Sequence, residues 1–179
     1  MKIAIATPLA AAVLLVPLLA VPGAGPVSGS GSALVVQGGA PSADALIDRF
    51  LQALQDKDRD ALRGLRLSEA EYREIVLPGH VPVGQPLRAY TEDTSKYAWA
   101  TLNTKSFYWE IALLHRFGGR AYEIRSKRYE EGVDEFATYT AYRQLRLMLQ
   151  EDDTPEVELR TGSIAEIGGQ FKFVSYIRD

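Results

Sequence analysis

The sequence predicts an α+β domain, because its two halves show different apolar periodicities. Between residues 42 and 117 the large apolar side chains recur at helical spacing, whereas from Arg120 onward they alternate with polar residues. The pair Gly168-Gly169, between two short strand-like segments, is typical of a tight β-hairpin. We expect N-terminal helices packed on a curved, cone-like, four-stranded antiparallel meander.

Three helices are expected before residue 78. Ser42 is a good N-cap, and it precedes five apolar residues on one stripe at helical spacing: Leu46, Ile47, Phe50, Leu51 and Leu54. A shorter helical segment begins at Asp58 or Asp60 and continues through Leu65. Ser68 and Glu71 have the spacing of a capping box, which predicts the start of a third helix that ends at Pro78-Gly79.

Residues 78–93 are expected to form a long irregular loop, because they include three prolines and two glycines. Loops of this length are often functional. Thr94 or Ser95 then caps a helical region that ends at Gly118-Gly119. The apolar pattern of this region changes phase around residues 103–105, which is compatible with one kinked helix or with two helices. The region is apolar enough to be largely buried.

Four antiparallel strands are expected in the second half, at residues 120–130, 134–149, 157–167 and 171–177. Glu131-Gly132 and residues 152–155 supply the first two turns, and Gly168-Gly169 supplies the third. On the last strand we expect Phe171, Phe173 and Ile177 to share one face.

The N-terminus has the features of an export signal. Lys2 is the only charged residue before Asp44, and it is followed by an apolar stretch and then by small residues. We therefore expect a signal peptide over 1–25, a flexible Gly/Ser/Pro tether over 26–41 and one domain over 42–179. An uncleaved apolar anchor is the alternative, and membrane contact is expected only in that case. Both alternatives place the domain outside the cytoplasm, in the periplasm or secreted.

The composition excludes several classes of chemistry. Twenty basic against 23 acidic residues give a net charge of −3, so nucleic acid is not expected as a partner. The absence of Cys excludes disulfides and thiol nucleophiles, and no metal or cofactor is expected. Asp56, Asp58 and Asp60 have the spacing that begins a calcium loop. However, Ala61 replaces the turn glycine and Leu67 the bidentate glutamate, so no calcium site is expected.

Three residues are candidates for acid–base catalysis: His80, Asp93 and His115. His80 lies in the Pro/Gly loop, and the ordinary pKa of an imidazole suits proton transfer. His115 lies near the end of the predicted aromatic helix, where a favourable interaction with the helix dipole is the alternative explanation.

Six further residues are candidates for ligand binding: Tyr90, Trp99, Asn103, Ser106, Tyr139 and Arg143. Trp99, Asn103 and Ser106 fall at helical spacing and would form an aromatic wall with amide and hydroxyl donors. A capping or kinking role explains Asn103 equally well. Cross-strand pairing is the alternative for the strand residues Tyr139 and Arg143.

The N-terminal helix pattern Leu46-Ile47-x-x-Phe50-Leu51-x-Ala53-Leu54, the short second helix and the terminal hairpin over 164–175 form a familiar combination. Over residues 42–178 it resembles the nuclear transport factor two-like superfamily. That resemblance implies a sheet curled around a helix to form a cone with a pocket. The segment 78–117 is larger than the resemblance implies and would fill or cover that pocket. No catalytic motif of the superfamily matches, so no residue is carried over.

These observations favour an exported, non-catalytic module that binds a small apolar or aromatic ligand or a protein partner in a pocket between helices and sheet. The alternative is a cofactor-free pocket enzyme of the isomerase, cyclase or hydratase type that uses a carboxylate or histidine base, because such folds host both kinds of function. A homodimer formed through the open sheet face is a further alternative.

Overall fold

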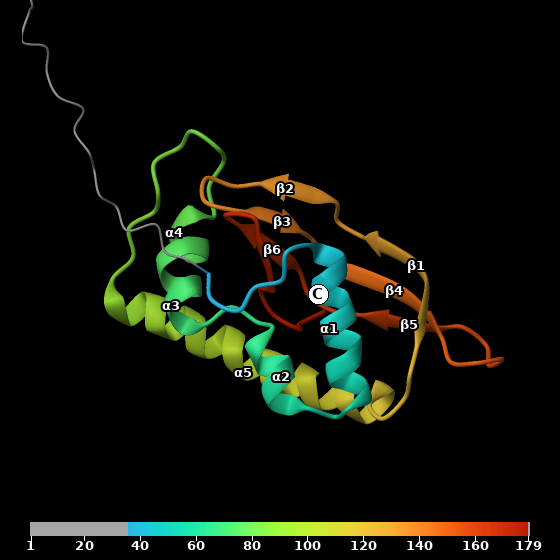
Figure 1. Cartoon of the computed structure of the whole chain (residues 1–179). Helices are drawn as coiled ribbons and strands as arrows, with labels where there is room; N and C mark the ends of the chain where they lie inside the picture. The colour runs from blue at the N-terminus through green and yellow to red at the C-terminus, as the bar shows by residue number, and fades with distance from the viewer. Residues whose placement is uncertain (1–35, 179) are drawn as a thin grey trace, which may run out of the picture. The chain divides into compact units, whose positions relative to one another are not determined.

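The α+β class is confirmed by the computed structural model, which describes residues 36–178 (Figure 1). A block of helices precedes two antiparallel sheets along the chain. The predicted signal peptide over 1–25, the first part of the predicted tether and Asp179 lie outside the described residues.

The helices begin where the sequence predicts for three of the four helical regions. They are α1 (Ala43–Gln55), α2 (Arg59–Gly64), α3 (Glu69–Glu71), the π-helix η1 (Tyr72–Val76), α4 (Leu77–Gly79) and α5 (Glu92–Phe117). The side chain of Ser42 caps α1 by accepting a hydrogen bond from the amide of Ala45. Asp58 caps α2 in the same way, and the capping box between Ser68 and Glu71 opens α3. These caps satisfy amides that otherwise lack a partner at a helix start.

Within residues 36–178, seven strands form two sheets instead of one four-stranded meander. They are β1 (Glu123–Tyr129), β2 (Val133–Glu135), β3 (Thr140–Tyr142), β4 (Leu145–Gln150), β5 (Val157–Arg160), β6 (Ile164–Ile167) and β7 (Gln170–Phe173). One sheet has the order β1-β4-β5 and the other the order β2-β3-β6-β7. Gln144 has a φ of 54°, and this left-handed residue separates β3 from β4 so that the two strands enter different sheets.

The terminal hairpin is confirmed. β6 pairs with β7 from Ile164 opposite Phe173 to Ile167 opposite Gln170. Gly168 and Gly169 both have positive φ, as a two-residue primed turn requires. Phe173 lies in the core, as expected. The residue of the C-terminal segment that is fully buried beside it is Tyr176, whereas the expected residue, Ile177, is only partly buried.

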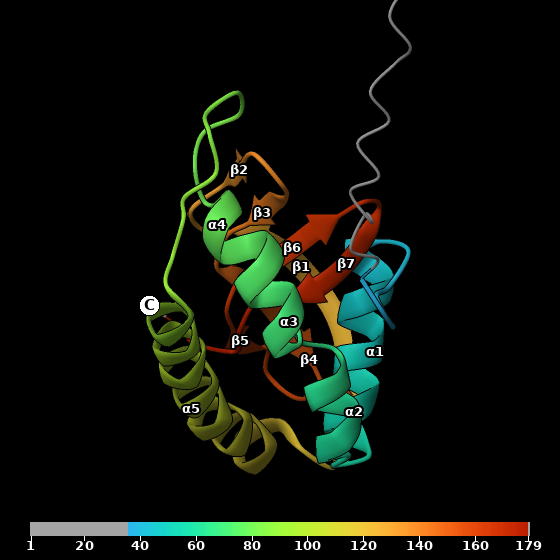
Figure 2. The same ribbon diagram turned by 90° about the vertical axis from the view of Figure 1, so that its left-hand side faces the viewer.

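The buried apolar residues form two clusters. The larger one joins α1, α2 and the end of α5 to β4, β5, β6 and β7, and its rings of Phe50, Phe173 and Tyr176 lie 5.1 to 5.5 Å apart. Accordingly, α1 contacts α2, α5 and β7, and α5 also contacts η1 (Figures 1 and 2). The smaller cluster lies between η1 and the inner residues of β3 and β6, including Ile75, Val76 and Ala165.

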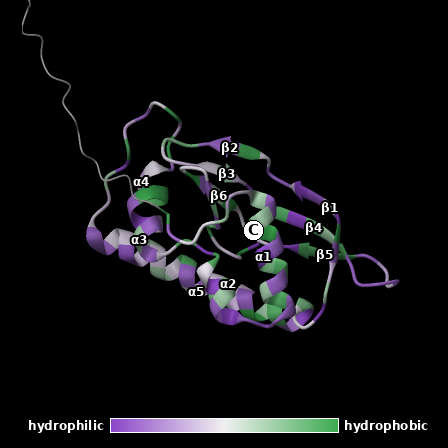
Figure 3. Ribbon diagram, viewed as in Figure 1, coloured by the Kyte–Doolittle hydropathy of each residue, from purple (hydrophilic) through white to green (hydrophobic). Residues whose placement is uncertain are grey.

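The expectation of a largely buried helix over 94–117 is wrong. α5 is one continuous helix that begins after Thr91, whose side chain accepts a hydrogen bond from the amide of Thr94. Hydrophobic and hydrophilic residues both occur along α5 (Figure 3), and Tyr97 and Tyr108 are 75 % and 67 % exposed. Its apolar residues lie all around the helix, so only some of them face the core. In the part of the chain that the structure covers, no helix meets the length and hydropathy needed to cross a membrane.

The end of the predicted tether, residues 36–41, is anchored to the domain at Val36, Gln37 and Ala40 and is not a flexible tether. The backbone amide and carbonyl of Ala40 exchange hydrogen bonds of 3.0 and 2.9 Å with Phe171 on β7. Ala40 is fully buried and Val36 nearly so. The amide of Gln37 donates to Glu71 at 3.0 Å. The backbone hydrogen bonds of Ala40 thus add this segment to the edge of the second sheet, beside β7.

Candidate functional site

A pocket of about 280 Å³ lies between the helical segment 72–80, α5 and the inner face of the second sheet. Its wall is mainly aromatic and aliphatic, with a few polar groups, as in most small-molecule sites. The residues that line it are Tyr72, Val76, Leu77, His80, Tyr90, Leu102, Phe136, Tyr139, Ala141, Arg143, Ser163 and Val174.

One side of the pocket is built by the helical segment 69–79. Its central part is the π-helix η1, a form that occurs frequently at functional sites. The segment ends at Gly79, which is pressed against Thr138, because a Cβ atom at Gly79 would lie 1.6 Å from the hydroxyl oxygen of Thr138. That hydroxyl donates to the carbonyl of Ile75 at 2.8 Å. The contact fixes the helix end against the turn between β2 and β3 and so places His80.

The loop after His80 is anchored at its base. The amide of Ala137 donates to the carbonyl of Val81 at 2.9 Å, and the amide of Arg88 donates to the carbonyl of Pro78 at 3.0 Å. Val81 is 4 % exposed, whereas the rest of the loop lies at the surface. The sequence prediction of an irregular loop holds for residues 80–91.

Three rings form a stack in the wall of the pocket. The centroids of the His80 and Phe136 rings lie 4.2 Å apart, and those of Phe136 and Tyr139 lie 4.9 Å apart. The Nδ1 atom of His80 lies 2.7 Å from the phenolic oxygen of Tyr139. This hydrogen bond joins the loop to the sheet across the ends of the stacked rings.

The surroundings of these two groups favour their neutral forms. Burial, and secondarily the cations Arg88 and Arg143, lower the pKa of His80 below its ordinary value. Burial raises the pKa of the Tyr139 phenol. Near neutral pH the pair is therefore an uncharged imidazole bonded to an uncharged phenol, which presents polar atoms without an isolated charge.

Arg143 supplies the cationic group of the pocket. It forms an ion pair of 3.0 Å with Asp134 and another with Glu131. Both carboxylates compensate the charge of Arg143 and fix its side chain. Arg143 therefore offers hydrogen-bond donors at the edge of the pocket rather than an uncompensated charge.

Another part of the pocket wall is formed by Tyr72 and Tyr90. Tyr72 packs against Trp99, with ring centroids 5.7 Å apart. Burial, and then the proximity of Tyr90, raise the pKa of Tyr72. Tyr90 is 38 % exposed and lies where the loop joins α5, so it forms part of the mouth.

The structure brings four of the sequence-predicted candidates into this one pocket: His80, Tyr90, Tyr139 and Arg143. The others lie elsewhere. Asp93 and His115 are exposed in the first and last turns of α5. Asn103 accepts a hydrogen bond of 3.2 Å from Arg66.

Trp99 and Ser106 have packing contacts. Trp99 lies behind Tyr72 and does not line the pocket. Ser106 is completely buried, and its hydroxyl accepts a hydrogen bond of 2.9 Å from the amide of Tyr176. It therefore ties α5 to the C-terminal segment.

Sequence reasoning missed Tyr72 and Phe136. Tyr72 lies within the third predicted helix, and Phe136 lies within residues 134–149, which are predicted as one strand. The strand break after Glu135 turns Phe136 toward His80, and no local residue pattern indicates that contact.

Across residues 36–178, no group of three or more His, Asp or Glu side chains is arranged to hold a metal ion. Comparison of the chain with protein-family models, with curated protein sequences and with solved structures finds no match.

Proposed function

We propose that this chain is an exported, non-catalytic module that binds one small apolar or aromatic molecule in the pocket between η1, α5 and the second sheet. The observation that carries the proposal is the pocket of about 280 Å³ with aromatic walls. Its volume lies close to the lower end of the range for small-molecule sites, which favours a compact ligand.

The orientation of the ligand follows from the chemistry of the lining residues. Tyr72, Leu102 and Val174 offer apolar surface. His80, Tyr139 and Arg143 offer hydrogen-bonding groups. A molecule with an apolar ring and one carbonyl or hydroxyl group would place its ring on the first set and its oxygen near the second.

A cofactor-free enzyme is the second candidate, and the contact between His80 and Tyr139 is the observation that favours it. An imidazole with a lowered pKa is largely unprotonated near neutral pH and so can accept a proton from a bound substrate. In that case, His80→Gln would stop conversion of a bound molecule while leaving its binding largely intact.

The binding proposal is tested with N-phenyl-1-naphthylamine, a neutral aromatic probe whose fluorescence increases in apolar surroundings. We expect saturable binding of one probe molecule per chain. Tyr90→Ala removes an aromatic ring from the mouth and should weaken this binding several-fold. Tyr97→Ala is the matched control, because Tyr97 is an exposed tyrosine of α5 that does not line the pocket.

Absence of saturable binding, or equal weakening by Tyr90→Ala and Tyr97→Ala, would contradict the proposal. Because the probe carries no charge, its binding does not depend on arginine residues elsewhere on the chain.

A further inference from the structure

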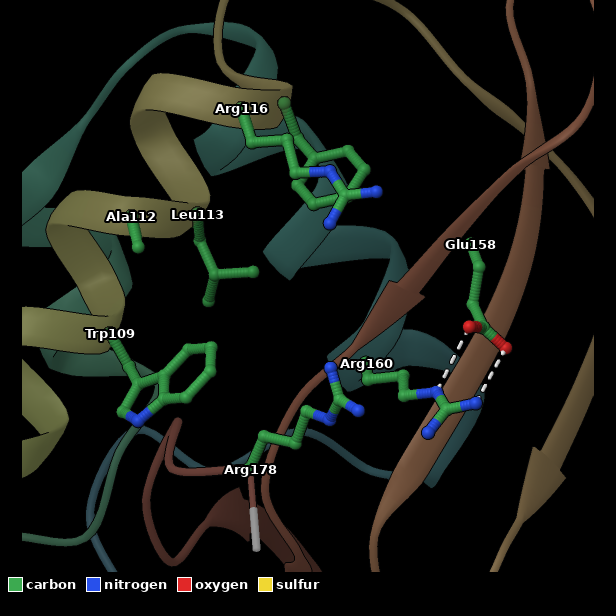
Figure 4. A pocket seen from close by; sticks show the side chains of 8 residues that line it. Trp109, Ala112, Leu113, Arg116, Glu158, Arg160 and Arg178 are labelled. Atoms are coloured by element: carbon green, nitrogen blue, oxygen red, sulfur yellow. Dashed lines mark hydrogen bonds and ion pairs between the residues drawn. The ribbon is translucent and has the colours of Figure 1, made fainter.

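A second, smaller cavity of about 150 Å³ lies beside the C-terminal half of α5 (Figure 4). Trp109, Leu113 and Phe117 of α5 form its apolar side. Arg116, Arg160 and Arg178 come from α5, β5 and the C-terminal segment and lie around the same space. None of these residues lines the first pocket.

The carboxylate of Glu158 in this cavity is shared between two arginines. It forms an ion pair of 3.0 Å with Arg160 and a second ion pair with Arg146. Glu130 lies next in the same network, 3.1 Å from Arg146 and 3.7 Å from Arg160. Arg160 therefore has two carboxylate partners, which it shares with Arg146.

Arg116 and Arg178 differ from Arg160 in their surroundings. Among residues 36–178, neither forms an ion pair, and the guanidinium of Arg116 lies 5.1 Å from the centre of the Phe117 ring. In Figure 4 the guanidinium of Arg178 lies between Trp109 and Arg160. The cavity thus contains two positive charges without a carboxylate partner in that part of the chain, although the whole chain has a net charge of −3.

We propose that this cavity binds a carboxylate attached to a single aromatic ring. A guanidinium group donates two parallel hydrogen bonds to a planar carboxylate, so Arg178, aided by Arg116, would hold the charged end. Trp109 and Phe117 would contact the ring.

The size of the cavity limits the ligand. A volume of 150 Å³ is close to that of an engineered apolar cavity that accommodates benzene. One ring therefore fits, and the carboxylate group would lie toward the arginines at the open side.

The test uses the full chain and benzoate as the probe. The chain has two tryptophans, so Trp99→Phe leaves Trp109 as the only tryptophan and makes its emission a local reporter. We expect a saturable change in Trp109 emission with benzoate at constant ionic strength. Benzamide, which has the same shape without the charge, should bind about tenfold more weakly or worse. Inorganic phosphate, an anion without a ring, should also bind about tenfold more weakly.

A charge-matched pair of double variants, each carrying Trp99→Phe, completes the test. Arg116→Gln with Arg178→Gln should weaken benzoate binding about tenfold or more. Arg120→Gln with Arg125→Gln removes the same charge from exposed arginines that do not line the cavity, and it should leave binding unchanged.

Three results would overturn the proposal. They are equal binding of benzoate and benzamide, equal binding of benzoate and inorganic phosphate, and equal loss in the two double variants. The comparison of the three probes needs no arginine variant, so it remains informative if a substitution disturbs folding. The outcome is independent of the first pocket, because Trp109 does not line it.

Discussion

The Nδ1 atom of His80 lies 2.7 Å from the phenolic oxygen of Tyr139, and Phe136 stacks against both rings. His80 follows the helical segment 69–79, whereas Tyr139 precedes β3. The contact therefore joins the helical side of the first pocket to its sheet side.

Tyr139→Phe tests the contribution of this hydrogen bond to stability. The substitution keeps the ring stack and removes the hydroxyl, so we expect a loss of about 0.5–1.5 kcal/mol in the free energy of unfolding. Urea denaturation measures it. Tyr108→Phe is the control, because Tyr108 is 67 % exposed, and it should change stability little. Equal effects of the two substitutions would argue against a structural hydrogen bond at His80.

The lowered pKa of His80 predicts a pH dependence of stability. In the unfolded chain the imidazole has its ordinary pKa of about 6.5, so on acidification the unfolded state takes up a proton before the folded state does. The stabilising contribution is therefore present above pH 6.5 and is lost as the pH falls through the lower, folded-state pKa. Urea denaturation at several pH values should show wild type losing stability relative to His80→Gln in this range. Parallel curves for the two proteins would contradict the shift.

Gly79→Ala should separate the helix end from the turn that contains Thr138. The new Cβ atom would lie 1.6 Å from the hydroxyl oxygen and 2.7 Å from the Cβ atom of Thr138. We expect a loss of about 1–3 kcal/mol in the free energy of unfolding and weaker probe binding in the first pocket.

Gly64→Ala is the matched control for that substitution. A Cβ atom at Gly64 meets nothing within 4 Å, and Gly64 is the last residue of α2, so we expect a gain of at most about 0.5 kcal/mol. The double variant Gly79→Ala with Thr138→Ala should recover part of the loss. No recovery would show that the cost comes from another contact.

The buried ion pair between Glu71 and Lys172 predicts a second effect of acid. Its atoms lie 2.9 Å apart, and both side chains are less than 10 % exposed. Burial by itself raises the pKa of Glu71, but hydrogen bonds from the Ser68 amide, Lys172 and the Gln37 amide outweigh it and lower the pKa overall. The contribution to stability is therefore present above the ordinary pKa of about 4.3 and lost as the pH falls below it.

Glu71→Gln should cost about 3 kcal/mol at neutral pH, because it leaves Lys172 buried without its counter-charge. Glu69→Gln is the control. Glu69 also forms an ion pair, 3.0 Å from Arg73, but its side chain is 47 % exposed, so we expect a loss below about 1 kcal/mol. Both values come from urea denaturation, and similar losses would contradict a stabilising role for the buried pair.

Local signals in the sequence predict the helix starts and the terminal hairpin well. Ser42, Asp58 and Ser68 cap as expected because a capping bond involves residues two or three positions apart. Gly168 and Gly169 form the predicted turn for a similar reason, since positive φ is a property of the residues themselves.

Long-range packing is what the sequence does not reveal. The exposure of α5 depends on which side faces the sheets. The division of residues 134–149 among three strands depends on the break at residues 136–139 and on the turn at Gln144. The sequence alone is enough to select His80 as a candidate for catalysis and Tyr139 as a candidate for ligand binding, because each choice depends only on the residue type and its predicted element. Their contact, and the place of Phe136 between them, arise only when the loop docks on the second sheet.

Methyl NMR with N-phenyl-1-naphthylamine tests the central proposal most directly, because it reports where the probe binds. Val76, Leu77, Leu102 and Val174 line the first pocket. We predict that their methyl signals shift together and saturate, while those of the larger core cluster, such as Leu147, Leu149 and Leu159, stay in place. Shifts in the core cluster without shifts in the pocket methyls would contradict the assignment of this pocket as the binding site.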